Sequence, residues 1–435
     1  MGKTVILGAG IAGLSAAYHL EKEGCNAIVF EQNDYTGGLC HSFKIDGFTF
    51  DTFIHLSFTK DATVRELFDS SVSDYLCHPP ESMNYWHGYW LRHPVQNNLY
   101  PLPTHERVNI IKSFLNRPIY DHYDNYAQWL YAQYGEYFAE KFPFQYNMKY
   151  WCSEPADMET MWVGDRMYCP VIDEILHGAL EQNSINTYYA NEMRYPKKGG
   201  FQSFLSKMES SIDVQLNKKV VRISPEEKTV SFVDGDTISY NKLISTIPMP
   251  EICNILPVPT QIISAAKKLT WTSGAIVSIG LKSLNAFPFE NAQLIIPPVL
   301  WFYVYDKDIL FSRVYYSSRK SPNNAPEGCS ALQAEIYFSS RVGSQPDLEK
   351  IRQDTLDSLV NMKIIKMHDV LFSDIRYEKY ANIVFNHSIY ESRKIVLDYL
   401  EKQGIISAGR FGEWDYFWSD QSVLSGKRAS IKVLE

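Results

Sequence analysis

The sequence predicts an α/β fold made of a Rossmann-like domain, a mostly helical insertion and an antiparallel β-sheet domain. Three observations predict it. The chain opens on a strand, a glycine-rich turn and a helix; helical segments fill much of 101–192; and apolar or alternating strands dominate 261–394. At 435 residues the chain is also too long for one ordinary core, so two or three domains are expected.

The first element is a strand over 4–7, followed by three glycines in the spacing G-x-G-x-x-G and a helix-forming segment, 14–22. Unpaired backbone N–H groups at the start of such a helix favour a bound pyrophosphate. We expect Gly8 to permit the turn, Gly10 to let the chain approach the phosphates, and Gly13 to let helix and strand pack closely.

A second strand, 27–30, ends in Glu31, at the spacing of the acid that accepts a ribose hydroxyl. Together these elements predict a dinucleotide site more specifically than the glycines alone. A second glycine pair, Gly37 and Gly38, follows the acid and precedes Leu39. This run resembles the doublet of the FAD-binding amine oxidase and protoporphyrinogen oxidase superfamily, which implies a permanently held FAD.

The C-terminal segment is expected to return to the same cofactor. Residues 405–412 read as a strand running into a glycine turn, and the stretch 419–422 reads as the cap of a last helix. The N-terminus of that helix would point at the pyrimidine end of the flavin, which becomes anionic on reduction. The expected cofactor contacts are Gly8, Gly10, Gly13, Glu31, Gly38, Leu39, Val220, Gly409, Arg410, Asp420, Gln421 and Ser422.

Composition argues against several functions. A formal charge of −8 disfavours a nucleic-acid partner. No apolar run of about 18 residues and no signal peptide are visible, so we expect a cytoplasmic protein without membrane insertion. The 7 cysteines form no CxxC and the 11 histidines no HExxH, so no metal site is expected. Aromatic residues make up 14%, part of which could line a sugar or nucleotide pocket.

The hydrophobic pattern predicts the helices, strands and domain boundaries in the middle of the chain. A hairpin over 40–58 leads to His55, a candidate flavin neighbour, although a lone histidine beside an apolar strand is as often structural. Helices are expected at 106–114, 126–134, 135–142, 173–182, 202–208 and 347–360. Strands are expected at 214–216, 220–223, 229–233, 243–247, 275–281, 293–296, 299–305, 310–316, 331–338 and 383–385. The domains would be an FAD-binding domain from 1–92, 195–260 and 395–435, a helical domain over 93–194, and a substrate sheet over 261–394.

Four stretches, 93–103, 162–171, 299–318 and 409–422, look like UDP-galactopyranose mutase, especially its eukaryotic form. The resemblance implies that two arginines, Arg166 and Arg313, grip a substrate diphosphate. Paired N–H donors on a fixed cation suit phosphate oxygens in any case, although each arginine could instead form an ordinary ion pair. The candidate catalytic residues are His55, Arg166 and Arg313. The resemblance implies substrate contacts from Gln96, Arg166, Trp301, Tyr303, Arg313 and Tyr416.

Several positions depart from that family. Val95 stands where an aromatic side chain stacks on uracil, and His93 replaces a tyrosine. Phe53 and Ile54 replace a glycine pair beside the flavin, so less room and a sugar other than galactose are expected there. Lys320 replaces a tyrosine near the diphosphate.

The function that the resemblance implies is a flavin-dependent interconversion of pyranose and furanose forms of a nucleotide-diphosphate sugar, serving cell-surface polysaccharide synthesis. N5 of reduced FAD would bond to the anomeric carbon, without net redox change, after reduction by a donor such as NAD(P)H. The alternatives are an FAD-dependent oxidase or desaturase, and a flavin-holding protein without catalysis. The sequence leaves a homo-oligomer open.

Overall fold

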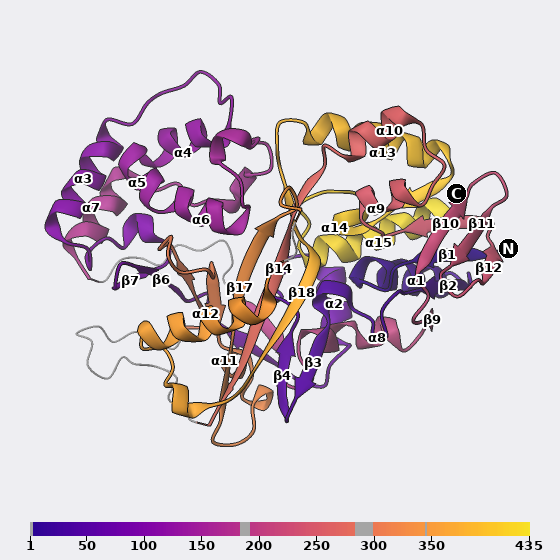
Figure 1. Cartoon of the computed structure of the whole chain (residues 1–435), viewed down its shortest axis with the longest axis horizontal. Coiled ribbons are helices and arrows are strands. Elements are labelled where there is room, and N and C mark those ends of the chain that lie inside the picture. Colours follow the sequence, from indigo (N-terminus) through magenta and orange to yellow (C-terminus); the bar gives the residue numbers. More distant parts are fainter. Residues whose placement is uncertain (1–2, 183–191, 283–298, 344–345) are drawn as a thin grey trace.

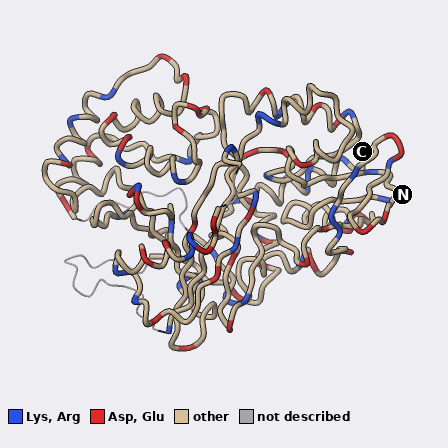
Figure 2. Tube along the Cα trace, in the orientation of Figure 1, with Lys and Arg blue, Asp and Glu red and all other residues tan. Residues whose placement is uncertain are grey.

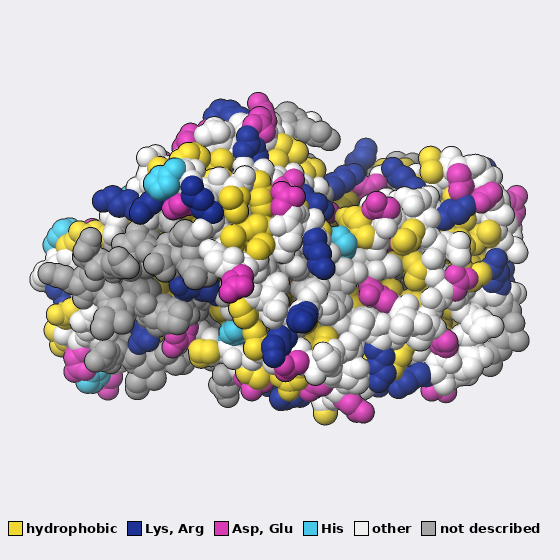
Figure 3. Space-filling model, turned by 90° about the horizontal axis from the view of Figure 1, so that it is seen from below, with side chains coloured by type: hydrophobic (Ala, Val, Ile, Leu, Met, Phe, Trp, Pro, Cys, Tyr) yellow, Lys and Arg dark blue, Asp and Glu magenta, His cyan; other side chains and the backbone are white. Residues whose placement is uncertain are grey.

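The computed structural model describes residues 3–182, 192–282, 299–343 and 346–435. The fold class is α/β, as predicted, with parallel and antiparallel sheets. Figure 1 shows the helical insertion on one side, the parallel sheet with both chain ends on the other, and three long strands between them. Lys and Arg are interspersed with Asp and Glu along the described trace (Figure 2). On the face in Figure 3, hydrophobic side chains occur in small groups between charged ones.

A five-stranded parallel sheet joins segments from the start, middle and end of the chain, in the order β19-β13-β1-β2-β9. Helix α15 packs along α1, and a Cβ on Gly426 would lie 2.2 Å from the carbonyl oxygen of Ala12. The last helix is therefore seated directly on the helix that follows the glycine turn. The bounds are β1 Thr4–Leu7, α1 Ile11–Lys22, β2 Ala27–Phe30, β9 Asp213–Gln215, β13 Lys242–Ser245, β19 Ile405–Ser407 and α15 Ser419–Leu434.

A seven-stranded sheet has the order β18-β14-β17-β16-β15-β6-β7. Its edge strand β7 and the neighbouring strand β6 come from the range 1–92, which the sequence assigns to the cofactor domain. The expected strand 293–296 lies outside the described residues. The bounds are β6 Ser82–Trp86, β7 Tyr89–Arg92, β14 Thr270–Leu281, β15 Trp301–Val304, β16 Arg313–Tyr315, β17 Ser330–Ser339 and β18 Val370–Val384.

The helical insertion has one helix that the sequence analysis misses, α6. Its signal is Pro143 at the first helical position, where a missing N–H costs nothing. Helix α4 has the expected bounds, and its neighbours differ by a few residues because helix ends are set by local capping. The helices are α3 Thr104–Leu115, α4 Tyr126–Tyr134, α5 Glu136–Lys141, α6 Pro143–Tyr150 and α7 Ile172–Leu180.

Smaller elements complete the described fold. The expected hairpin forms as β3 and β4, and the expected helix 202–208 is a 3-10 turn, Phe201–Leu205, followed by α8. Strands β10, β11 and β12 make a separate antiparallel sheet. The remaining bounds are β3 Ser42–Ile45, β4 Phe48–Asp51, α2 Ala62–Asp69, β5 Tyr75–His78, β8 Met193–Pro196, α8 Ser206–Glu209, β10 Val220–Ser224, β11 Thr229–Phe232, β12 Thr237–Ser239, α9 Met249–Asn254, α10 Thr260–Ala266, α11 Ser317–Lys320, α12 Leu348–Asn361, α13 Ile389–Lys402 and α14 Gly409–Gly412.

Candidate active site

A cavity of about 970 Å³ runs between the parallel sheet, the helical insertion and the seven-stranded sheet. Most of the side chains singled out from the sequence line it, although they come from every part of the chain. Those that do are Gly8, Gly10, Glu31, Gly38, Leu39, His55, Gln96, Arg166, Val220, Trp301, Tyr303, Arg313, Gly409, Arg410, Tyr416 and Ser422.

The glycine turn has the geometry that a pyrophosphate site needs. Gly8 has φ +99°, and a Cβ there would lie 2.2 Å from Oγ1 of Thr246. The Glu31 carboxylate accepts the Ala9 N–H at 2.8 Å and the Asn33 N–H at 2.9 Å, which holds the turn against the second strand. By contrast, the described atom nearest to a Cβ on Gly10 would be the Gly38 Cα, at 4.0 Å. The turn is therefore tightly packed at Gly8, whereas at Gly10 it is open towards the cavity. A bound phosphate requires this open space.

The start of α15 differs in detail from the sequence expectation. Trp418, not Ser419, is the N-cap, and its N–H donates to Oε1 of Gln421 at 2.9 Å. Oδ1 of Asp420 accepts the Gln421 N–H at 2.9 Å. Both side chains therefore satisfy the helix terminus itself, and of the predicted quartet Ser422 lines the large cavity together with Ser419. Gln421 lines a smaller pocket next to it.

Arg313 is held by a buried carboxylate. Its Nε and Nη2 donate to Oε2 of Glu335 at 2.9 and 2.5 Å, and Tyr337 donates to the same oxygen at 2.9 Å. Oε1 of Glu335 accepts the N–H of Ile54 at 2.9 Å. Burial opposes the charge of Arg313, but Glu335 holds its pKa above the ordinary value. Among the described residues its Nη1 has no hydrogen-bond partner, so the cation keeps donors for a ligand.

Arg166 lies on the other wall of the cavity. Its Nη1 donates to the Trp162 carbonyl at 2.7 Å, and its guanidinium lies 4.8 Å from the centre of the Tyr416 ring. Arg410 lies 5.1 Å from the centre of the same ring. The Nε atoms of both arginines are buried and have no partner within the described residues. Such unpaired donors are costly in a closed protein, so they fit a site for an anionic group.

Aromatic rings join the two arginines. Tyr303 pairs with Arg313 across β15 and β16, and its ring packs on Tyr146 at 5.3 Å. Tyr146 packs on Tyr150 at 5.5 Å, and both belong to α6. Neither tyrosine is among the site residues expected from the sequence, although their spacing of four residues after a proline is a recognisable helix signal. The rings continue to Arg166 through Trp151 and Tyr416, whose centres lie 5.6 Å apart.

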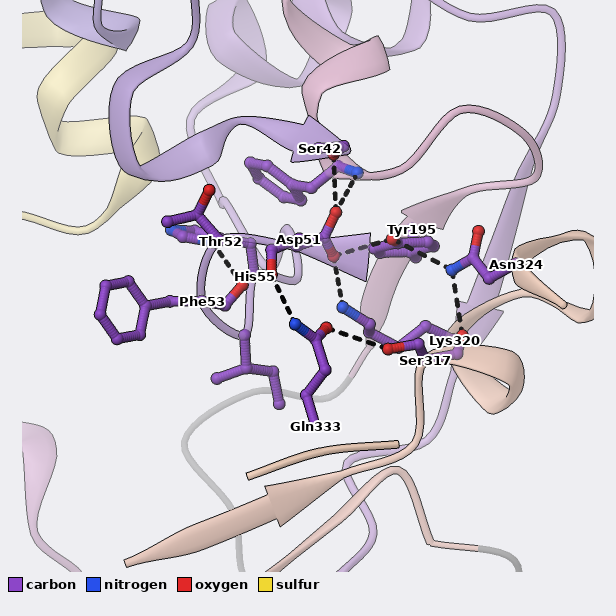
Figure 4. A network of polar contacts seen from close by, with 12 residues as sticks. Ser42, Asp51, Thr52, Phe53, His55, Tyr195, Ser317, Lys320, Asn324 and Gln333 are labelled. Carbon is purple, nitrogen blue, oxygen red and sulfur yellow. Dashed lines mark hydrogen bonds and ion pairs between the residues drawn. The ribbon is translucent and has the colours of Figure 1, made fainter. Parts of the chain in front are cut away.

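His55 lines the cavity, and Nδ1 of its ring lies 3.0 Å from the carbonyl oxygen of Phe53. Burial lowers the pKa of His55 to about 4. Lys320, expected near the diphosphate, instead lies outside the cavity lining. It is fully buried in an ion pair with Asp51, because the hairpin strand β4 carries that carboxylate into the same interior (Figure 4).

The structure also corrects the expectation that Phe53 narrows the cavity. Phe53 is buried against Tyr337, with ring centres 6.0 Å apart, and does not line the cavity, whereas Ile54 does. Gly274 makes the room for Phe53. A Cβ on Gly274 would lie 2.8 Å from Cζ of Phe53. The bulky side chain is thus accommodated in the seven-stranded sheet.

Replacing Gly274 with alanine (G274A) is expected to lower the free energy of unfolding by about 1–3 kcal/mol, because the new methyl group overlaps the Phe53 ring. Urea unfolding measures this change. The double variant G274A/F53L should recover most of the loss, since leucine lacks the clashing ring atom. Equal stability of G274A and the unaltered protein would contradict the packing described above.

The two positions 93 and 95, where the sequence departs from the resembling family, also line the cavity. Val95 is buried and lines the cavity. His93 lies 5.1 Å from the Tyr303 ring, with Nδ1 3.3 Å from Oδ1 of the buried Asn84. Burial lowers the pKa of His93 to about 4. Both positions therefore present uncharged surface to a ligand.

The comparisons with known proteins give the family. The description that matches residues 11–430 is flavin containing amine oxidoreductase. This chain belongs to that family. A flavin cofactor follows from the membership, and the open Gly10 cradle and the orphaned arginine donors fit it. The protein is accordingly an enzyme of the FAD amine oxidoreductase superfamily.

Curated relatives of this flavin containing amine oxidoreductase match over short stretches. A 1-hydroxycarotenoid 3,4-desaturase of Flavobacterium sp. (strain P99-3) is 51% identical over 51 residues, 12% of this chain and 10% of the relative. An all-trans-retinol 13,14-reductase of Danio rerio is 51% identical over 51 residues, 12% of this chain and 8% of the relative. The chain thus matches about a tenth of the length of these relatives.

Solved structures match over the whole chain. A crystal structure of reduced UDP-galactopyranose mutase has a TM-score of 0.91 and 25% identity, and the match covers 100% of this chain and 96% of that one. A fatty acid isomerase from P. acnes that produces CLA has a TM-score of 0.63 and 13% identity, over 100% of this chain and 99% of that one. The second likeness concerns the fold alone.

The described residues offer neither a metal site nor a membrane-spanning helix. Between 3–182, 192–282, 299–343 and 346–435, no cluster of three or more His, Cys, Asp or Glu side chains could hold a metal ion. In the same ranges, no helix combines the length and apolar character needed to span a bilayer.

Proposed function

We propose that this protein is a flavin-dependent nucleotide-sugar mutase that interconverts pyranose and furanose forms of a UDP-galactose-like sugar. One observation carries the proposal. Arg166 and Arg313, supplied by the helical insertion and the seven-stranded sheet, line the same cavity as the glycine turn. Two cations there suit a diphosphate whose sugar extends towards the flavin. The likeness to reduced UDP-galactopyranose mutase over the full chain supports it.

The chain's own residues would bind and orient the substrate. Arg313, with donors left over from Glu335, and Arg166, with its orphaned Nε, would hold the diphosphate. Tyr303, Trp301 and the two α6 tyrosines would pack the sugar and exclude water. Gln96, which lines the same cavity, would contact the base. Reduced flavin would supply the nucleophile for the anomeric carbon, and a donor such as NAD(P)H would reduce it.

The test is to reduce the purified holoprotein without oxygen, add UDP-galactopyranose, and look for the furanose by NMR. We expect conversion with reduced flavin and none with oxidised flavin. If intact reduced holoprotein converts neither UDP-galactose nor other nucleotide sugars, the mutase proposal is wrong.

An FAD-dependent oxidase or desaturase is the second candidate, because the curated relatives include a desaturase and a reductase. These relatives match only about a tenth of their own length, so they support an oxidase or desaturase weakly. Such a reaction would also give Arg166 and Arg313 no anionic group to bind. Turnover with oxidised flavin and release of hydrogen peroxide would favour it over the mutase.

A further inference from the structure

A buried ion pair lies beside the segment that carries His55 (Figure 4). The Asp51 and Lys320 side chains are both fully buried, 269 positions apart in the chain. Although burial alone would raise it, Lys320 holds the pKa of the Asp51 carboxyl below its ordinary value. Asp51 is thus a carboxylate four residues before His55, on the segment 51–55 that leads from β4 to the cavity wall.

The carboxylate does not need a lysine to satisfy its oxygens. Oδ1 of Asp51 accepts the Ser42 hydroxyl at 2.7 Å and the Phe201 N–H at 2.9 Å. Oδ2 accepts the Tyr195 hydroxyl at 2.8 Å. Three neutral donors already provide its hydrogen bonds, and a buried ammonium is costly to desolvate. What Lys320 adds to them is a positive charge.

The protonation of His55 depends on the charges around its ring, including that of Lys320. The charged groups that act on its ring are Asp51, Glu335 and Lys320. The two carboxylates favour imidazolium, whereas burial and Lys320 oppose it. Glu335 is already neutralised by Arg313. Lys320 does the same for Asp51, so each of the two carboxylates has its own cation.

The hydrogen bond of His55 shows which ring nitrogen carries the proton when the imidazole is uncharged. An uncharged imidazole carries one N–H, and the Phe53 carbonyl can only accept. Nδ1 must therefore carry the proton towards the Phe53 oxygen, 3.0 Å away, which leaves Nε2 as an acceptor. The segment is also fixed in place, because Gln333 donates to the Asp51 carbonyl at 2.9 Å and the Ile54 N–H donates to Glu335.

We infer that Lys320 is a positioning residue that neutralises Asp51 and so, together with the burial of the ring, keeps His55 as an uncharged hydrogen-bond acceptor at the wall of the flavin cavity. The inference rests on the flavin site of the family and does not depend on the proposed mutase reaction. Without the ammonium, the field of the Asp51 carboxylate favours a protonated His55. A positive charge there favours the added electrons of a reduced flavin.

The experiment compares three variants of the FAD-loaded protein: K320M, D51N/K320M and K149M. The pKa of His55 is measured by NMR of ¹⁵N-labelled histidine, with H55Q assigning the signal, and the flavin midpoint potential is measured against pH. K320M should raise the pKa of His55 by at least about one unit, a tenfold gain in proton affinity. Its midpoint potential should become more positive wherever His55 is protonated.

The double variant removes the carboxylate as well and should return both quantities to the values of the unaltered protein. K149M is the matched control, because Lys149 is a buried lysine that donates to the Val304 and Phe311 carbonyls and leaves the Asp51 pair intact. A K320M protein with unchanged His55 pKa and potential would overturn the inference. So would equal shifts in K320M and the double variant.

If K320M does not fold, the unaltered protein can still overturn the inference. Its His55 should be uncharged and protonated at Nδ1 at about pH 5.5, where an ordinary histidine is mostly charged. A His55 that is charged at that pH, or protonated at Nε2, would overturn the inference.

Discussion

Replacing Arg313 with alanine (R313A) is expected to lower kcat/KM for the nucleotide sugar by roughly 10²- to 10⁴-fold. Each charge-assisted hydrogen bond to the diphosphate contributes about 1.5–3 kcal/mol, and we expect Arg313 to supply two. Furanose formation under anaerobic reduction, followed by NMR, measures the change. A loss of less than about threefold would contradict a role for Arg313 in holding the diphosphate.

The same substitution also leaves Glu335, which is fully buried, without its cation. Removing one partner of a buried pair costs about 3–5 kcal/mol of stability. The double variant R313A/E335Q separates the two effects, because a neutral glutamine needs no counter-charge. It should regain most of the stability and none of the activity. If activity returns together with stability, Arg313 acts only through folding.

Replacing Gly10 with alanine (G10A) should abolish stable FAD binding while leaving the apoprotein folded. Within the part of the chain that the structure describes, a Cβ on Gly10 meets no atom closer than 4.0 Å, so it projects into the space that the pyrophosphate needs. We expect FAD affinity to fall by at least about 100-fold, or about 2.8 kcal/mol. Flavin content after purification and titration with FAD measure the loss.

Gly13 provides the contrasting variant. Its Cβ would lie 2.0 Å from the carbonyl oxygen of Gly8, which belongs to the backbone and cannot move aside cheaply. G13A should therefore lose thermal stability even without cofactor, whereas G10A should melt like the unaltered apoprotein. FAD binding by G10A at ordinary affinity would mean that the glycine turn does not receive the pyrophosphate.

Local patterns allowed much of this fold to be predicted. The glycine turn, the hairpin before His55 and helix α4 depend on residues close in sequence, so their signals are visible in the chain. Arg166 and Arg313 were placed by flanking motifs, and the structure brings them to one cavity. Whether they bind a diphosphate stays a prediction.

Partnerships between distant residues could not be predicted in this way. Glu335 lies within a strand that the sequence shows as mostly apolar, and nothing near it in sequence points to Arg313 as its partner. Lys320 was expected near the diphosphate, but the side chain that determines its position, Asp51, lies 269 positions away. Likewise, only the fold reveals that Gly274 makes room for Phe53.

The seating of α15 on α1 has a consequence for biosynthesis. Strand β19 and helix α15 belong to the end of the chain, yet the sheet and the wall of the flavin cavity need both. While the ribosome still holds these residues, the cavity beside the N-terminal glycine turn lacks the wall that the end of the chain provides. Stable cofactor binding is therefore expected only after β19 and α15 have left the ribosome and packed on the sheet, and nascent chains depend on remaining soluble until then.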